Sequence, residues 1–225
     1  MRRAAVTTIA AALALIVGVA FLSLDRKQGE VAAAPPSPAK TASTPAPPPT
    51  GRIAVTPDQL REARAAGLID RPIKSLLDVR EPMKYGEFRW DERGVPRGRA
   101  WARVDLDTQL ISVFRAGHEI GTAVVLYGAD GLPTPTGKFP IRAKTRNHRS
   151  RTYDNAPMPY SLWLTRDGVA IHGSNVRWGF ATHGCVGIPT AFAAKLFGAL
   201  NVGDEVQIVS GKPRKQASAP PRKPS

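Results

Sequence analysis

The only cysteine of the chain, Cys185, lies two residues after His183 and thirteen residues after His172. A single cysteine cannot form a disulfide within its own chain. A thiol accompanied by imidazole side chains is typical of nucleophilic acyl transfer, because imidazole can accept the thiol proton and the resulting thiolate attacks carbonyl groups. The residue types and their spacing therefore indicate a Cys/His site with Cys185 as its nucleophile.

The residues around Cys185 favour this chemistry. A helix predicted over residues 189–200 would begin four residues after the cysteine, and a nearby helix N-terminus lowers the pKa of a thiol. Gly184 allows a tight turn whose amide N–H groups could hold the oxyanion of a tetrahedral intermediate. His172 ends a predicted strand, so its ring could face the cysteine across a cleft, and His183 could orient a partner.

Two other interpretations of the same residues are open. A lone buried cysteine is often an inert, small apolar side chain. His172, His183 and Cys185 could also be three zinc ligands, although the chain has no second cysteine and no Cys-x-x-Cys spacing. The Thr182-His183-Gly184 context of the cysteine favours the nucleophile over the inert thiol.

The elements that must position these residues are mostly short strands. Segments rich in β-branched residues, separated by turns, predict strands over residues 102–106, 110–114, 119–126, 138–143, 160–165, 168–172 and 205–209. Residues 189–200 have Phe192, Leu196 and Leu200 at helical spacing and predict an amphipathic helix. The expected fold is mainly β, a sandwich or barrel-like domain with one packed α-helix after the cysteine.

The chain divides into five predicted segments. Residues 1–24 are an expected signal anchor, because Arg2 and Arg3 precede an apolar run long enough to span a membrane. Residues 25–50 form an Ala/Pro-rich linker and residues 211–225 a disordered basic tail. An N-terminal extension, residues 51–100, is expected to pack on the main domain, residues 101–210, and to contain a helix over residues 57–66 that begins with a capping box.

The formal net charge of +14 is spread along the chain rather than concentrated in one domain. Residues 101–210 lack the basic, aromatic-bearing surface expected of a nucleic-acid-binding protein, so we expect no nucleic acid partner. Five Lys/Arg residues lie within residues 142–151, which we predict to be a loop. This basic loop, which includes Arg146 and Arg149, is either solvated surface or a rim that attracts acidic substrates. Trp178 is a candidate wall of the substrate site.

Several motifs of the chain together resemble the L,D-transpeptidase catalytic domain (YkuD type) of bacterial cell-wall enzymes. The resemblance covers about residues 103–209 and rests on Val104-Asp105-Leu106, Leu110-Ile111-Ser112-Val113-Phe114, Pro133-Thr134-Pro135-Thr136-Gly137-Lys138-Phe139, Ala156-Pro157-Met158-Pro159-Tyr160, His172-Gly173 and Thr182-His183-Gly184-Cys185. It implies that Cys185 is the nucleophile, His172 the main general base and acid, and His183 a supporting histidine. It also implies that Gly173 and Thr182 shape the site, and that the backbone of Gly184 and Cys185 binds the oxyanion.

The resemblance also implies a reaction and a location. Cys185 would attack the carbonyl of the diamino acid at position three of a peptidoglycan tetrapeptide stem and release D-alanine. An amine acceptor would then give a 3→3 cross-link or tether an envelope protein, whereas water would give L,D-carboxypeptidase activity. No metal or organic cofactor is implied. The domain would lie on the periplasmic side of the inner membrane, anchored by the N-terminal helix, or free in the periplasm after cleavage.

One position departs from the pattern. Proteins of this kind usually carry Arg or Asn two residues after the cysteine, where this chain has Gly187. This difference favours a second function, a non-catalytic wall-binding protein of the same fold. The presence of His172, His183 and Cys185 favours the enzyme.

Overall fold

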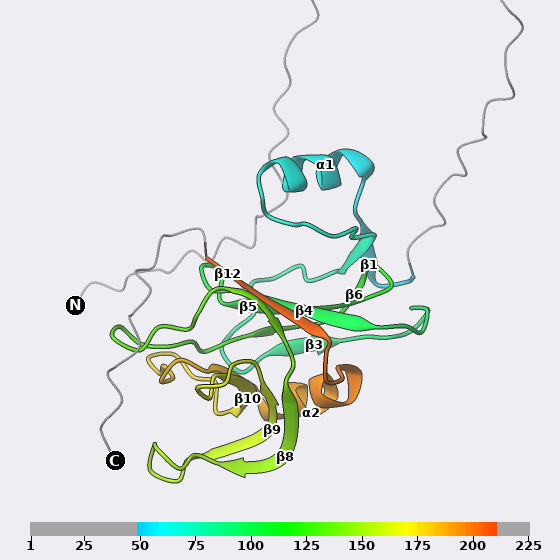
Figure 1. The fold of residues 1–225 in the computed structure, drawn as a ribbon. Helices are drawn as coiled ribbons and strands as arrows, with labels where there is room; N and C mark the ends of the chain where they lie inside the picture. Colours follow the sequence, from blue (N-terminus) through cyan, green and yellow to red (C-terminus); the bar gives the residue numbers. More distant parts are fainter. Residues whose placement is uncertain (1–48, 211–225) are drawn as a thin grey trace, which may run out of the picture.

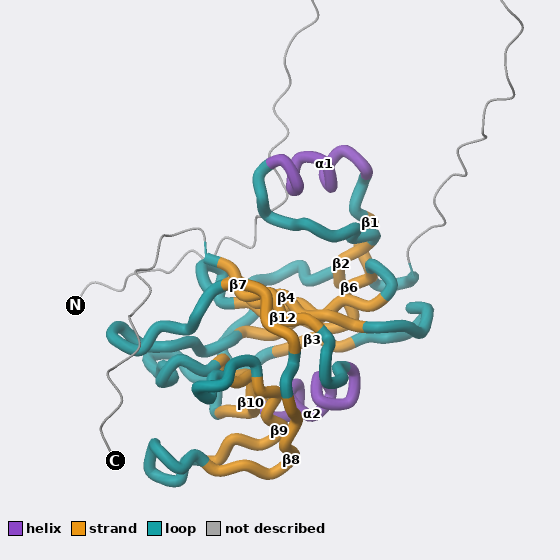
Figure 2. Tube along the Cα trace, in the orientation of Figure 1, coloured by secondary structure: helices purple, strands orange, loops and turns teal. Residues whose placement is uncertain are grey.

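The computed structural model describes residues 49–210 (Figure 1). The predicted anchor, the basic tail and nearly all of the linker lie outside these residues. No helix within residues 49–210 has both the length and the apolar character needed to cross a membrane. The described part consists of two β-sheets and two helices, and the prediction of a mainly β fold is confirmed (Figure 2).

The larger sheet has eight strands in the order β1-β2-β6-β5-β4-β12-β7, with β3 paired to β6. The strands are β1 (Arg52–Ala54), β2 (Ser75–Leu77), β3 (Phe88–Trp90), β4 (Ala100–Asp105), β5 (Leu110–Arg115), β6 (His118–Val124), β7 (Gly137–Pro140) and β12 (Glu205–Val209). Strands β4, β5 and β6 form the antiparallel meander expected from the sequence. The C-terminal strand β12 lies between β4 and β7, parallel to the first and antiparallel to the second.

The smaller sheet has four strands in the order β11-β10-β9-β8. They are β8 (Ala143–Arg149), β9 (Pro157–Trp163), β10 (Ala170–Ser174) and β11 (Val186–Pro189), and helix α2 (Thr190–Ala199) follows directly. Strands β8, β9 and β10 are antiparallel, whereas β10 and β11 are parallel. The predicted basic loop over residues 142–151 is wrong, because most of it forms the edge strand β8. The predicted strand over residues 138–143 is correspondingly two strands, β7 and the start of β8.

The main core lies between the two sheets and includes one side of α2. In β4, Ala102 and Val104 point into this core, while Trp101 points to the opposite face. Phe192 of α2 is fully buried and makes edge contacts with the rings of Phe88 and Trp90, at centroid distances of 5.7 and 5.3 Å. This packing fixes α2, and with it the preceding strand β11, against the larger sheet.

The first part of the extension, with helix α1, packs on the outer face of the larger sheet. Helix α1 (Pro57–Ala65) begins with the predicted capping box, in which Thr56 and Gln59 exchange hydrogen bonds of 2.9 and 3.2 Å. Ile73, Trp101 and Phe114 form a small apolar cluster beneath it, with Trp101 and Phe114 stacked at 4.7 Å. Strands β1, β2 and β3, which the sequence analysis did not predict, extend the larger sheet from within the extension.

A buried carboxyl group joins the extension to the larger sheet. Glu119 of β6 is 5% exposed, and its Oε2 accepts a hydrogen bond of 2.8 Å from the backbone N–H of Leu77. The guanidinium of Arg52 donates to the carbonyl oxygen of the same glutamate at 2.6 Å. Burial raises the pKa of Glu119 to about 7, because the charged carboxylate loses its hydration.

This carboxyl group makes stability depend on pH. The folded protein binds more protons than the unfolded chain between pH 4.5, the ordinary pKa of glutamate, and about 7. The free energy of unfolding should therefore fall as the pH rises through this window, by up to about 3 kcal/mol. Urea unfolding at several pH values measures the effect, and Glu119→Gln should flatten the curve. An equally steep fall in the variant would contradict this assignment.

Candidate active site

The pairing of β10 with β11 places His172 and Cys185 on one face of the smaller sheet. In this parallel pair Ile171 lies opposite Val186 and His172 opposite Gly187. Cys185 directly precedes the first paired residue of β11 and therefore lies beside Ala170. Because side chains alternate along a strand, Cys185 and His172 share the outer face, while Ile171 and Val186 point into the core. The pairing thus brings His172 of β10 and Cys185, the residue before β11, to one face, two residues apart in register.

The environment of His172 sets its protonation. Nδ1 lies 3.0 Å from the carbonyl oxygen of Gly173, which can only accept, so Nδ1 carries a proton. In the neutral ring Nε2 is then the atom with the free lone pair. The side chain is 8% exposed. Its burial lowers the pKa of His172, the bond to Gly173 opposes this, and nearby His148 lowers it further. His172 is therefore a neutral base near pH 7.

Cys185 is a free, partly buried thiol. Burial raises the pKa of Cys185, and a hydrogen bond with the backbone of Ala170 opposes the shift only in part. Its Sγ lies 3.8 Å from the carbonyl oxygen of Gly168. Within residues 49–210 no hydrogen bond joins Sγ to His172.

The predicted influence of a helix N-terminus on the thiol is wrong. Helix α2 begins at Thr190, and the four residues of β11 separate it from Cys185. Four strand residues span about 13 Å, whereas the field of a helix end acts within its first turn. The helix start was predicted to within one residue, but the intervening residues form the extended strand β11, which was not predicted.

The turn that carries Cys185 is fixed by two threonines. Thr182 Oγ1 donates to the carbonyl oxygen of Cys185 at 2.5 Å, and Thr134 Oγ1 contacts the same oxygen at 3.3 Å. Thr134 also accepts a bond of 2.9 Å from the N–H of Gly128. Gly184, at φ +107°, occupies a backbone conformation that side chains disfavour. Thr134 belongs to a motif noted in the sequence, but its contact with the cysteine could not be read from spacing.

The other predicted histidine lies at the surface. His183 is exposed, and its ring stacks on Tyr153 of the β8–β9 connection, with centroids 3.9 Å apart and planes 15° apart. The predicted wall residue Trp178 is 75% exposed in the segment between β10 and β11. Phe180, in the same segment, is 61% exposed. Exposed aromatic side chains therefore lie in the segment that leads to the turn, and Tyr153 lies against His183 of the turn itself. Tyr153 and Phe180 were missed because nothing in their local sequence marks them.

The predicted substrate-binding residues occupy different environments. Gly173 is buried, and a Cβ there would lie 3.0 Å from Pro159 and 3.1 Å from Thr190. Arg146 lies over the rings of Tyr160 and Phe197, at 5.7 and 5.4 Å, and so covers α2. Arg149, at the end of β8, is exposed and has no ion pair within residues 49–210.

Another basic residue of β8 has a structural contact. Lys144 donates bonds of 2.6 Å to the carbonyl oxygens of Phe197 and Leu200, at the C-terminus of α2. A cation there satisfies carbonyl groups that have no partner in the helix. Of the five basic residues, Lys144 and Arg146 therefore contact the helix or its end, and all except Lys144 are exposed.

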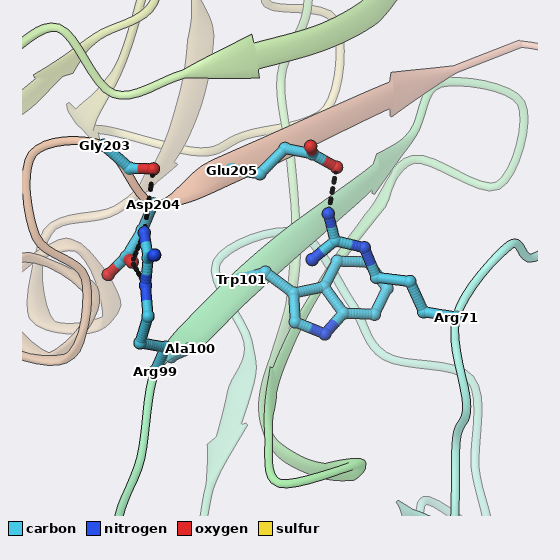
Figure 3. A pocket seen from close by; sticks show the side chains of 7 residues that line it. All are labelled: Arg71, Arg99, Ala100, Trp101, Gly203, Asp204 and Glu205. Carbon is cyan, nitrogen blue, oxygen red and sulfur yellow. Dashed lines mark hydrogen bonds and ion pairs between the residues drawn. The ribbon is translucent and has the colours of Figure 1, made fainter.

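A separate pocket of about 370 Å³ lies on the other sheet, between the extension and the start of β12 (Figure 3). Its charged groups already pair with one another. Arg71 meets Glu205 at 2.5 Å and lies 4.8 Å from the centre of the Trp101 ring, and Arg99 meets Asp204 at 2.9 Å. The pocket contains none of the predicted site residues, and we interpret it as an ion-paired seam that holds the extension.

Within the described residues no three His, Cys, Asp or Glu side chains gather closely enough to hold a metal ion. His183 stacks on Tyr153 rather than facing the other two candidate ligands.

Comparison with known proteins identifies the domain. Residues 99–208 match the family model for the L,D-transpeptidase catalytic domain (YkuD). A search of curated protein sequences found no match.

Solved structures of L,D-transpeptidases are similar over about half of this chain. One from Stackebrandtia nassauensis is 27% identical, with 52% of this chain and 58% of that one covered and a TM-score of 0.47. One from Mycobacterium smegmatis is 21% identical, with 49% and 58% covered and a TM-score of 0.45. L,D-transpeptidase 3 from Mycobacterium tuberculosis, in complex with a faropenem-derived adduct, is 18% identical, with 48% and 59% covered and a TM-score of 0.43.

The chain thus spans less than two thirds of the length of these structures. The assignment rests on the family-model match, which covers β4 to β12 and includes the paired strands that carry His172 and Cys185. Residues 99–208 of this chain thus match the L,D-transpeptidase catalytic domain (YkuD) family.

Proposed function

We propose that this protein is a cysteine L,D-transpeptidase that acts on peptidoglycan stem peptides. The observation that supports this most directly is the shared face of β10 and β11, on which a neutral His172 and the only thiol of the chain lie two residues apart in register. The match of this region to the family model supports the same reaction class.

The proposed first half-reaction is acylation. Nε2 of His172 takes the proton from Cys185, and the thiolate attacks the carbonyl carbon of the diamino acid at position three of a tetrapeptide stem. The backbone N–H groups of Gly184 and Cys185 hold the oxyanion. When the C–N bond breaks, the protonated His172 returns the proton to the leaving D-alanine, and a thioester to Cys185 remains.

The proposed second half-reaction transfers the acyl group. An amine of a second stem attacks the thioester, His172 accepts the amine proton, and the thiol is regenerated with a 3→3 cross-link formed. With water the same intermediate gives L,D-carboxypeptidase activity, and with an amine of an envelope protein it gives a tethered protein. Trp178, exposed in the segment between β10 and β11, would form one wall for the bound peptide.

Intact-mass measurement tests the proposal. Incubation with purified disaccharide-tetrapeptide should add the mass of the donor minus D-alanine, and a supplied stem amine should remove the adduct as a cross-linked product. Faropenem should also add covalently to the protein; L,D-transpeptidase 3 from Mycobacterium tuberculosis has been solved in complex with a faropenem-derived adduct. Binding of the donor without any adduct would favour the wall-binding alternative.

The exposed end of β8 should contribute to substrate binding. Arg149 and Arg151 are exposed, and stem peptides carry free carboxylates. Contacts made equally in the ground and transition states change KM and leave kcat unchanged. Arg149→Ser with Arg151→Ser should therefore raise KM about 3- to 10-fold at low ionic strength, and less at high salt.

A matched pair controls for the loss of two charges. Arg61→Ser with Arg64→Ser removes the same net charge from exposed positions of α1, on the far side of the larger sheet (Figure 1). Steady-state kinetics at two salt concentrations compare the pairs. An equal rise of KM in both would mean that net charge alone matters, and no rise in either would leave β8 as solvated surface.

We also propose that the N-terminal segment holds the domain at the periplasmic face of the inner membrane, with the Ala/Pro-rich linker as a spacer. The proposal rests on the length of the apolar run and on the charges at residues 2 and 3. N-terminal sequencing of the mature protein decides it, because a start near Ala33–Pro35 would mean a released enzyme.

A further inference from the structure

Gly187, the position that departs from the family pattern, lies directly opposite His172 in the parallel pair of strands. A Cβ atom at Gly187 would lie 2.9 Å from Oγ and 3.0 Å from Cβ of Ser174. The first distance is shorter than Cβ contacts in proteins, and the second is at their lower limit. The same Cβ would lie 3.4 Å from that of Leu126. The space beside Gly187 is thus already filled by the side chain of Ser174.

The backbone of Gly187 cannot move to make room. Leu126 and Gly187 exchange two backbone hydrogen bonds, of 2.8 and 2.9 Å, on the side away from β10. On its other side Gly187 is held in the ladder with His172. Its φ lies outside the left-handed region, so glycine is present for space and not for backbone conformation. A larger residue would have to displace Ser174.

The position that Ser174 takes brings its hydroxyl to the catalytic ring. Ser174 Oγ lies 3.3 Å from Nδ1 of His172, the nitrogen that also donates to the carbonyl oxygen of Gly173 at 3.0 Å. Since Nδ1 carries the proton, the hydroxyl oxygen is its second acceptor. Two acceptors on one N–H limit the rotation of the ring about χ2 and keep Nε2 on the opposite side.

We infer that Ser174 is a positioning residue for His172, and that Gly187 is small so that Ser174 can take this place. The pair replaces the side chain that related proteins usually carry at the position of Gly187. The absence of that side chain is then no sign of a lost activity. The catalytic consequence rests on the proposed function, whereas the effect on the His172 ring does not.

Four variants separate the hydroxyl group from the space it fills. Ser174→Ala removes the acceptor only, and Gly187→Ala forces Ser174 away from the ring. Ser174→Gly with Gly187→Ala fills the same space from the neighbouring strand without a hydroxyl. Ser174→Thr keeps the hydroxyl. Thermal unfolding reports packing, and NMR titration of the His172 ring in the free protein reports the hydrogen bond.

The expected results differ between the two readouts. Ser174→Ala should lower the pKa of His172, because an acceptor on Nδ1–H stabilises the charged ring, and should slow acylation about 2- to 10-fold. Gly187→Ala should also lower the pKa of His172 and slow acylation, and it should in addition lower the melting temperature. The double variant Ser174→Gly with Gly187→Ala should have the melting temperature of the natural protein, but the pKa of its His172 should stay lowered. Ser174→Thr should titrate as the natural protein does.

His148 provides a control for the titration of His172. His148 lowers the pKa of His172, so His148→Gln should raise it and show that the titration responds in both directions. The inference would be overturned if the pKa of His172 were unchanged in Ser174→Ala, or if it returned to its natural value in Ser174→Gly with Gly187→Ala. A shifted titration in a protein that never forms a thioester would leave the inference standing and refute the proposed function.

Discussion

Cys185→Ala should abolish thioester formation and cross-linking of tetrapeptides. The reason is that Cys185 is the only thiol of the chain and shares a face with the neutral base His172. The substitution should not unfold the turn, since Thr182 and Thr134 hold the carbonyl oxygen of residue 185 and not its side chain. Intact-mass spectrometry and product analysis measure the loss.

A loss of activity is informative only if the Cys185→Ala variant is correctly folded. Circular dichroism and the melting temperature of Cys185→Ala should match those of the natural protein. If a correctly folded alanine variant still cross-links stem peptides, Cys185 is not the nucleophile and the mechanism proposed above is wrong.

His172→Ala should lower the acylation rate by about 10²- to 10⁴-fold, the usual contribution of a general base and acid. In the natural protein the rate should fall as the pH decreases through the pKa of His172, which burial holds below its ordinary value of 6.5, because the protonated ring cannot accept the thiol proton. The variant should lose this limb of the pH profile. Stopped-flow acylation at several pH values measures both effects.

His183→Ala is the matched comparison. His183 stacks on Tyr153 at the surface, so its removal should loosen the β8–β9 connection and reduce the rate far less. The remaining activity should keep the pH profile of the natural protein. An indispensable His183 together with a dispensable His172 would exchange their roles.

The sequence alone predicted those elements whose signals are local. The capping box of α1 and the antiparallel meander β4–β6 depend on residues within one turn or on period-two alternation, and both formed as expected. The strand β8 was misread because arginines suggested a loop. It is an edge strand, and charged side chains are common there because they prevent pairing with other chains.

In the site, too, local motifs could be predicted and contacts between distant residues could not. The motif marked His172 and Cys185, but their shared face depends on the parallel pairing of β10 with β11. Strand β11 has only four residues, two of them Gly187 and Pro189, and no strand propensity scale would select it. Thr134, Tyr153 and Ser174 act through contacts made only after the chain folds, so spacing could not reveal them.

The place of β12 in the larger sheet bears on when this protein can fold. The last strand of the described chain is inserted between β4, formed about a hundred residues earlier, and β7, for which it is the only strand partner within residues 49–210. Contacts between such distant residues form late and slowly. During synthesis the domain therefore stays incomplete until its final residues emerge, and a chain that ends before Glu205 leaves two strand edges open to aggregation.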